Sequence, residues 1–200
     1  RVLFRSRPGA TRLGVIGCGR QAVTQIACIR EALPSLQETV VYCRDAARLA
    51  AFCREHRCTA AESHRDAADA DVVVTVTTSR DPVLRGEWLR PGALVCAVGA
   101  NDLRRRELDN AVLERAAFVC CDSREQSRRE SGDLAEPVAQ GSLDWLEVHE
   151  LQEVVDGELQ GRAHADDIVL FKSNGLAAWD VAVAARVVEL ARERGVGLAV

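Results

Sequence analysis

The chain has 200 residues, 48% of them hydrophobic, and a formal net charge of −4 at pH 7. This length suits one compact domain, or one domain with an additional docking helix, and is short for two full domains. The acidic balance argues against nucleic acid or an anionic membrane surface as a partner. The longest apolar runs, 70–78 and 93–100, are too short for a membrane-spanning helix, so we expect a soluble protein.

The sequence contains no methionine, so we expect a processed product or a fragment that lacks an N-terminal part. Its eight cysteines include no C-x-x-C pair, and most lie in apolar runs. Because no signal peptide is visible, we expect buried, reduced thiols and a cytoplasmic location, although a lost N-terminus could have carried a targeting segment. The four histidines show no metal-ligand spacing and no G-x-S-x-G elbow is present, so neither a metal site nor serine hydrolysis is expected.

Short β-branched runs alternate with amphipathic stretches along the chain, which predicts an α/β fold. We expect a Rossmann-like, doubly wound, mostly parallel sheet with helices on both faces. The predicted strands are 13–16, 39–43, 71–77, 93–98, 117–121 and 168–171. The predicted helices are one over 22–33, one over 46–56 capped by Asp45, a surface helix over 104–114 and a long one over 175–194, with a helix or loop at 123–130.

These elements divide the chain into three parts. Residues 1–10 are a leader or an extraneous segment, and 11–174 form the main domain. Residues 175–200 hold the last helix, whose apolar positions form one stripe: Ala177, Val181, Ala184, Val188 and Ala191. That stripe needs a partner, which could be this domain, an absent N-terminal part or another subunit.

The run Gly14 to Ala22 has the pattern G-x-G-x-x-A and lies between a predicted strand and a predicted helix. Gly17 allows a tight turn, Gly19 lets the backbone approach a diphosphate, and Ala22 allows close packing of the helix on the strand. The amides at the start of the helix would then face the phosphates of a dinucleotide. The alternative is a purely structural turn.

The end of the second strand chooses between coenzymes, because an acidic side chain there binds the ribose hydroxyl and repels a 2′-phosphate. This sequence has Cys43 followed by Arg44. A guanidinium can hold a phosphate with two parallel hydrogen bonds, so we favour NADP(H) over NAD(H). The alternative is that Arg44 is an ordinary exposed arginine and that Asp45 meets the ribose.

Polar and small residues follow two further strands, at the edge where ligands of open α/β sheets bind. The hydroxyls of Thr77, Thr78 and Ser79 would line the nucleotide cleft, or serve only as strand residues. In the next strand end, at Val98 and Gly99, the glycine would let a flat nicotinamide or a substrate approach.

Three polar residues at strand ends have two interpretations each. Asn101 and Asp102 are weak candidates for catalysis, and Asp102 could instead cap the next helix. Ser173 could contact the cofactor or cap the last helix. The residues alone do not assign the catalytic groups.

Five runs together resemble the ornithine cyclodeaminase and mu-crystallin family of NAD(P)-dependent proteins, over about residues 11–197. They are GVIGCGRQA (14–22), ADVVVTVTTSRDPVL (70–84), LRPGALVCAVGANDLRRRELD (89–109), ESGDL (130–134) and DIVLFKSNGLAAWDVAVA (167–184). The first motif fits many dehydrogenases, whereas the others point to this family.

The resemblance implies a dinucleotide-binding domain beside an N-terminal substrate domain that also forms a homodimer, with the last helix docked on that domain. The substrate-binding arginine and lysine would lie in the absent part, so this chain alone would bind nucleotide without turnover. By resemblance, Arg44 would hold the adenosine phosphate, the stretch 77–79 the nucleotide and Ser173 the nicotinamide end. The diphosphate would be held by Gly17, Gly19, Arg20, Gln21 and Ala22.

The sequence departs from the family pattern at Asn101, where true ornithine cyclodeaminases have a catalytic aspartate. An amide cannot exchange protons as a carboxylate does. Cyclodeaminase activity would therefore require Asp102 to take the role of the missing aspartate. The resemblance therefore implies a reductase of cyclic imino acids, such as pyrroline or piperideine carboxylates, or an amino-acid dehydrogenase. The alternatives are an ornithine cyclodeaminase and a non-enzymatic, NADPH-dependent binding protein of the crystallin type.

Overall fold

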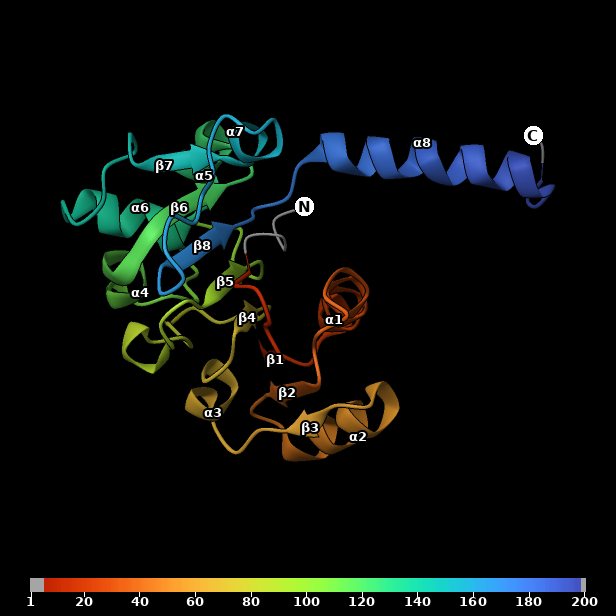
Figure 1. Cartoon of the computed structure of the whole chain (residues 1–200), viewed down its shortest axis with the longest axis horizontal. Coiled ribbons are helices and arrows are strands. Elements are labelled where there is room, and N and C mark those ends of the chain that lie inside the picture. The colour runs from red at the N-terminus through yellow and green to blue at the C-terminus, as the bar shows by residue number, and fades with distance from the viewer. Residues whose placement is uncertain (1–5, 199–200) are drawn as a thin grey trace.

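The computed structural model describes residues 6–198, so residues 1–5 of the expected leader and 199–200 of the last segment lie outside it. Eight parallel strands form one sheet in the order β3-β2-β1-β4-β5-β8-β6-β7 (Figure 1). The expected Rossmann-like α/β fold is confirmed. The strands are β1 (Arg12–Ile16), β2 (Glu38–Tyr42), β3 (Thr59–Ala60), β4 (Val72–Thr75), β5 (Leu94–Ala97), β6 (Ala116–Cys121), β7 (Val148–Glu150) and β8 (Ile168–Lys172).

Helices cover both faces of the sheet because successive side chains of each strand point in opposite directions. Val15 of β1 packs with Ile26 of α1 on one face, whereas its neighbour Ile16 belongs to the core cluster of the other face, with Ala67 of α3. The helices are α1 (Arg20–Ala32), α2 (Ala46–His56), α3 (His64–Ala68), α4 (Asn110–Arg115), α5 (Arg124–Glu130), α6 (Gly132–Ala139), α7 (Leu151–Val155) and α8 (Ala177–Arg194).

The predicted strands all occur, with ends that differ by one or two residues. The strands β3 and β7 were not predicted, because they have two and three residues and lie at the two edges of the sheet. Asp45 caps α2 as expected, since its carboxylate accepts a hydrogen bond from the Arg48 amide.

The prediction of a surface helix over 104–114 is wrong for its first half. The helix α4 begins only at Asn110, capped by Asp109. Glu107 and Leu108 are fully buried in the loop before it, where the Glu107 carbonyl accepts hydrogen bonds from the amides of Val83 and Leu84. Burial of this loop against another part of the chain overrides its helical pattern.

The helix α8 extends away from the sheet, and none of its residues is buried (Figure 1). Val181 and Val188 of the predicted stripe are 69% and 47% exposed. At the other end of the described chain, Arg7 forms an ion pair with the buried Asp71 and Ala10 is buried. Arg7 and Ala10 of the expected leader therefore contact the domain, whereas Pro8 and Gly9 are exposed.

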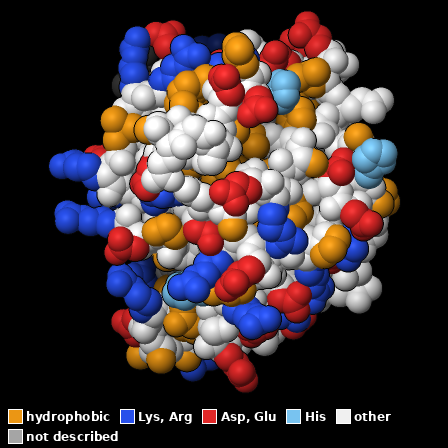
Figure 2. Space-filling model, turned by 90° about the vertical axis from the view of Figure 1, so that its left-hand side faces the viewer, with side chains coloured by type: hydrophobic (Ala, Val, Ile, Leu, Met, Phe, Trp, Pro, Cys, Tyr) orange, Lys and Arg blue, Asp and Glu red, His pale blue; other side chains and the backbone are white. Residues whose placement is uncertain are grey.

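On the side of the molecule opposite α8, basic and acidic side chains are interspersed over the surface (Figure 2). Within residues 6–198, no helix combines the length and the apolar character needed to cross a bilayer.

Candidate functional site

The turn after β1 has the geometry that its glycines predict. Gly17 has φ +120°, and a Cβ atom there would lie 2.4 Å from the Val76 carbonyl oxygen. Its amide donates to the Tyr42 carbonyl at 2.8 Å, which fixes the loop to the end of β2. Gly19 is the N-cap of α1, so no side-chain hydrogen bond caps this helix. A Cβ at Gly19 would meet open space. The first amides of α1 therefore face an open region suited to an anion.

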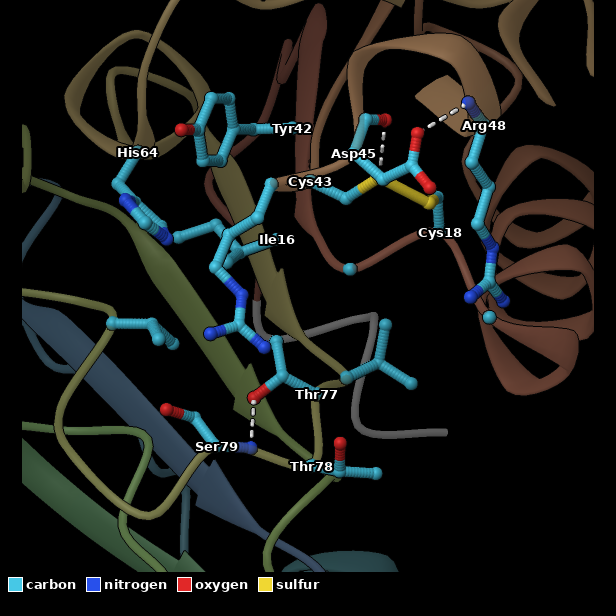
Figure 3. A pocket seen from close by; sticks show the side chains of 15 residues that line it. Ile16, Cys18, Tyr42, Cys43, Asp45, Arg48, His64, Thr77, Thr78 and Ser79 are labelled. Carbon is cyan, nitrogen blue, oxygen red and sulfur yellow. Dashed lines mark hydrogen bonds between the residues drawn. A yellow bond between two sulfur atoms is a disulfide. The ribbon is translucent and has the colours of Figure 1, made fainter. Parts of the chain in front are cut away.

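The strand order reverses between β2-β1 and β4-β5, which places a crevice at the carboxyl ends of β1 and β4. A pocket of about 350 Å³ lies on one side of this point; we name it pocket A (Figure 3). The turn 17–19, the β2 end and the stretch after β4 line it. Its walls are Ile16, Gly17, Cys18, Gly19, Tyr42, Cys43, Arg44, Asp45, Arg48, His64, Val76, Thr77, Thr78, Ser79 and Val83.

A second pocket of about 720 Å³, pocket B, lies on the other side and shares Gly19 and the stretch 76–78 with pocket A. It is lined by the start of α1, by the ends of β5 and β8 and by Trp179 of α8. The two pockets together form a continuous cleft that passes the start of α1. A dinucleotide has this elongated shape, with the diphosphate between its two halves.

Twelve of the fourteen predicted site residues line this cleft. In pocket A they are Gly17, Gly19, Arg44, Thr77, Thr78 and Ser79, and pocket B adds Arg20, Gln21, Val98, Gly99, Asn101 and Ser173. The other two do not line it. Ala22 is fully buried on the inner face of α1, and the Asp102 carboxylate is held by the amide and guanidinium of Arg104.

Asp102 does not cap a helix, because α4 begins at Asn110 with Asp109 as its N-cap. Hydrogen bonds from the Arg104 side chain and amide lower the pKa of its carboxyl far below the usual range. A carboxyl that stays ionised in this way is a poor proton donor near neutral pH.

Cys18 and Cys43 are joined by a disulfide across the wall of pocket A (Figure 3). Their Cα atoms are 5.9 Å apart, within the normal range for a bridge. The expectation of reduced thiols is therefore wrong for these two. Parallel pairing of Ile16 with Tyr42 brings the ends of β1 and β2 together. Cys18 and Cys43 are 25 residues apart in the sequence, so their spacing does not reveal that they meet.

Basic side chains surround the outer part of pocket A. Arg44 and Arg48 line it, and the ring of His64 packs against Tyr42 with centroids 4.4 Å apart. Burial, assisted by the positive charge of Arg44, lowers the pKa of His64. The Asp45 carboxylate also lines this pocket, but it accepts the Arg48 amide at 2.9 Å as the cap of α2. Apart from Arg44 and Asp45, these residues belong to no recognisable sequence pattern.

Several hydroxyls at and after the end of β4 make hydrogen bonds within the chain. Thr75 and Thr77 donate to the carboxylate of Glu107 at 3.0 and 2.8 Å, and the Ser79 hydroxyl donates to the Asp81 carbonyl. Within residues 6–198, Thr78 is the member of this stretch whose hydroxyl makes no hydrogen bond. The stretch therefore forms the floor of the cleft mainly through its backbone.

The buried Glu107 organises the loop after β5. Its carboxylate accepts hydrogen bonds from the amides of Thr77, Gly99 and Ala100 at 2.7, 2.7 and 3.2 Å. Burial raises the pKa of Glu107 above its ordinary value. A Cβ at Gly99 would meet the backbone of Thr77 at 2.4 Å, so this packing requires glycine there.

A second buried pair lies next to Glu107. Lys172 at the end of β8 pairs with Asp133 of α6, and its ammonium group donates to the carbonyl of Ala100. Asp133 accepts the amides of Glu107 and Leu108 at 2.7 and 3.0 Å. No sequence motif assigns a role to Lys172 or Asp133. A lysine that ends an apolar strand nevertheless indicates a buried partner.

The loop after β8 is held by Asp122. Its carboxylate accepts the Ser173 hydroxyl at 2.9 Å and the amides of Asn174 and Gly175 at 2.8 and 2.7 Å. Ser173 is not a helix cap, because α8 begins at Ala177. The Oδ1 atom of Asn174 is buried without a partner in the described chain, and this residue lines pocket B. An amide donor of a ligand would satisfy that oxygen.

The chain is similar to several characterised proteins. It is 33% identical to alanine dehydrogenase of Archaeoglobus fulgidus, over 97% of this chain and 61% of that protein. The structure of Thermococcus litoralis Delta(1)-pyrroline-2-carboxylate reductase in complex with NADH and L-proline matches with a TM-score of 0.90 and 32% identity, over 100% of this chain and 64% of that one. An archaeal alanine dehydrogenase dimer with bound NAD matches with a TM-score of 0.88 and 31% identity, over 98% and 63%.

These matches extend over almost the whole sequence, whereas the chain spans only about 61% of the length of the curated relative. The family model that describes ornithine cyclodeaminases and mu-crystallins matches residues 2–195. Together with the glycine turn, the two-pocket cleft and the sheet order, this match shows that the chain belongs to the ornithine cyclodeaminase/mu-crystallin family.

Proposed function

We propose that this chain is the coenzyme-binding part of an NAD(P)H-dependent oxidoreductase that reduces the C=N bond of a cyclic imino acid, or oxidises the corresponding amino acid. The observation that carries this proposal is the cleft formed by pockets A and B, with the free amides of α1 at its centre. The similar structures that hold NADH or NAD support it.

The residues present fit such a coenzyme. The turn 17–19 and the first amides of α1 would hold the diphosphate, and pocket A would take the adenosine half. Pocket B would take the nicotinamide half, where the unpaired Asn174 Oδ1 offers an acceptor to the carboxamide.

When bound, NAD(P)H supplies a hydride, which adds to the imine carbon while the nitrogen gains a proton. The chain contributes orientation, because Glu107 and Lys172 fix the loop 99–101 that forms one wall of pocket B. Asn101 on this wall can donate and accept hydrogen bonds but cannot exchange a proton as a carboxylate does. This difference favours reduction over cyclodeamination.

We propose NADP(H) as the preferred coenzyme. Arg44 and Arg48 place two positive charges around pocket A, where a 2′-phosphate would lie. The competing feature is Asp45, whose carboxylate favours a ribose hydroxyl. Its use as the cap of α2 reduces its capacity to accept one.

We also propose how the chain sits in the longer protein. Residues 11–174 form the dinucleotide-binding domain, and α8 docks its exposed valines on an N-terminal substrate and dimerisation domain. The dimer in the similar alanine dehydrogenase structure supports this arrangement. Six free cysteines within the described residues are consistent with a cytoplasmic location.

The test combines binding and turnover. Calorimetry on this chain should show association with NADPH or NADH. If neither coenzyme binds, the proposal is contradicted. The protein with its substrate domain should consume NADPH steadily when pyrroline-2-carboxylate is supplied. Ammonia and proline formed from ornithine without net coenzyme change would instead indicate a cyclodeaminase, and coenzyme binding with neither activity a crystallin-type binding protein.

A further inference from the structure

We infer, on the basis of the proposed coenzyme binding, that Cys18 and Cys43 are a reversible dithiol–disulfide pair and that its reduction increases coenzyme affinity. The pair links two walls of pocket A. Cys18 lies inside the glycine turn, between Gly17 and Gly19, and Cys43 directly follows β2. The bridge therefore joins the segment proposed to hold the diphosphate to the segment proposed to hold the adenosine ribose.

The position of the pair is set by the sheet and does not depend on the bridge. Ile16 and Tyr42 are paired in neighbouring parallel strands, so the residues that follow them emerge side by side. The Gly17 amide also bonds to the Tyr42 carbonyl at 2.8 Å. Reduction would therefore leave the two thiols close together and ready to form the bridge again.

Among the free cysteines of the described residues, Cys28 is exposed at pocket B, whereas Cys58, Cys96 and Cys120 are poorer candidates for this chemistry. Burial raises the pKa values of Cys96 and Cys120 to about 12, which suppresses the reactive thiolate. Cys58 is half-buried, with its pKa raised by burial, and it lies outside both pockets. Cys18 is buried and Cys43 is half-buried, and both line pocket A, through which a reductant would reach the bridge.

The bridge restricts pocket A in two ways. It fixes the separation of the glycine turn and the β2 end at a Cα distance of 5.9 Å, so the walls cannot adjust around a nucleotide. It also removes the thiol proton of Cys43, whose sulfur lies 3.5 Å from the Asp45 carbonyl oxygen. A reduced Cys43 would have both a local acceptor and freedom to turn toward the ribose.

The redox step balances with ordinary thiol reagents. A dithiol, such as dithiothreitol or a thioredoxin-type protein, attacks one sulfur to give a mixed disulfide, and its second thiol then releases the chain. Two electrons and two protons pass to Cys18 and Cys43, and the reductant becomes a disulfide. Glutathione disulfide reverses the reaction and leaves as two molecules of glutathione.

The experiment compares the full chain equilibrated in dithiothreitol with the same chain equilibrated in glutathione disulfide. Peptide mapping of the oxidised sample should find Cys18 linked to Cys43. Calorimetry should show that the reduced form binds NADPH or NADH about tenfold more tightly than the oxidised form. The variant C43S, which cannot form the bridge, should show no dependence on redox state, and C18S gives a second route to the same result. The variant C58S should keep the full dependence.

Equal affinity of the reduced and oxidised chains, or the absence of a Cys18–Cys43 link after oxidation, would overturn the inference alone. A redox dependence that persists in C43S and C18S would overturn it as well. Failure of both redox forms to bind either coenzyme would overturn the proposed function and the inference together.

Discussion

Lys172 Nζ lies 3.0 Å from Asp133 Oδ2, and both side chains are fully buried. The pair connects the last strand of the sheet to α6, and through the Ala100 carbonyl it also holds the loop at the wall of pocket B. Two charges placed so deeply are stable only together, because either one alone would lack compensation. The pair therefore links the stability of the domain to the shape of its cleft.

The first prediction follows from this pairing. Lys172→Met should lower the free energy of unfolding by about 3–5 kcal/mol, because it leaves Asp133 buried and unpaired. In Lys172→Met/Asp133→Asn the amide oxygen can still accept the two backbone amides, so the double variant should lose less than the sum of the single variants. Urea denaturation of the wild type, Lys172→Met, Asp133→Asn and the double variant measures the coupling between the two side chains. Additive losses would contradict this coupling.

Two glycines of the turn should respond differently to the same methyl group. Gly17→Ala should destabilise the fold by about 1–3 kcal/mol or more, because a Cβ meets the Val76 carbonyl and φ is positive. Gly19→Ala meets open space and only places a poorer N-cap residue before α1, so the loss should be no more than about 1 kcal/mol. Its NADPH affinity should nevertheless fall, because the methyl occupies the proposed diphosphate site. Urea denaturation and calorimetry on both variants separate the two effects, and unchanged affinity in Gly19→Ala would contradict the placement.

Arg44 provides the test of coenzyme choice. Arg44→Ala should weaken NADPH binding by about 1.5–3 kcal/mol, the usual value of a hydrogen bond to a charged group, and leave NADH binding nearly unchanged. Arg54→Ala, at an exposed position of α2 outside pocket A, is the control. Calorimetric titration with both nucleotides decides the matter; an unaltered preference for one of them would remove the case for a phosphate site at Arg44.

Asp71 should contribute to stability in a pH-dependent manner. Burial acts to raise the pKa of its carboxyl, but hydrogen bonds from the amides of Thr11 and Arg12 and from Arg7 outweigh burial and lower it. A lowered pKa means that the stabilisation is complete above the unfolded value of 3.8 and is lost as the pH falls through the lower folded value. Urea midpoints measured from pH 5 downward should fall more steeply for the wild type than for Asp71→Asn. Parallel curves would contradict this role.

The exposed face of α8 predicts two outcomes for one substitution. Val181→Asp should change the unfolding free energy of this chain by less than about 0.5 kcal/mol, because the side chain is 69% exposed. In the protein with its N-terminal domain, the same charge should reduce dimer formation in sedimentation experiments. Arg194→Asp, in the last turn, is the control that adds acidic charge away from the stripe. An unaffected dimer in Val181→Asp would argue against docking through this face.

The sequence predicts the sheet well and the supporting polar network poorly. Runs such as 72–75 are apolar throughout, which is the pattern of a strand buried on both faces. The Glu107 loop shows the limit. Leu108 and Val112 have helical spacing, but Glu107 is held by Thr77 and Asp133, which are 30 and 26 residues away in the sequence.

The candidate site divides in the same way. The glycine turn carries its own local signal, so Gly17 and Gly19 are found from the sequence. Cys18 and Cys43 meet only through the pairing of β1 with β2, and His64 reaches pocket A from α3. These relationships depend on tertiary structure, which spacing along the chain does not encode.

The strand β8 is the last to be synthesised, yet it lies between β5 and β6 near the middle of the sheet. A nascent polypeptide halted before residue 168 would present two open strand edges, one on each side of the vacant position. Completion of the sheet therefore has to wait until the ribosome has released almost the entire described chain. During that interval the open edges of β5 and β6 can pair with strands of other chains, which exposes the incomplete sheet to edge-to-edge aggregation.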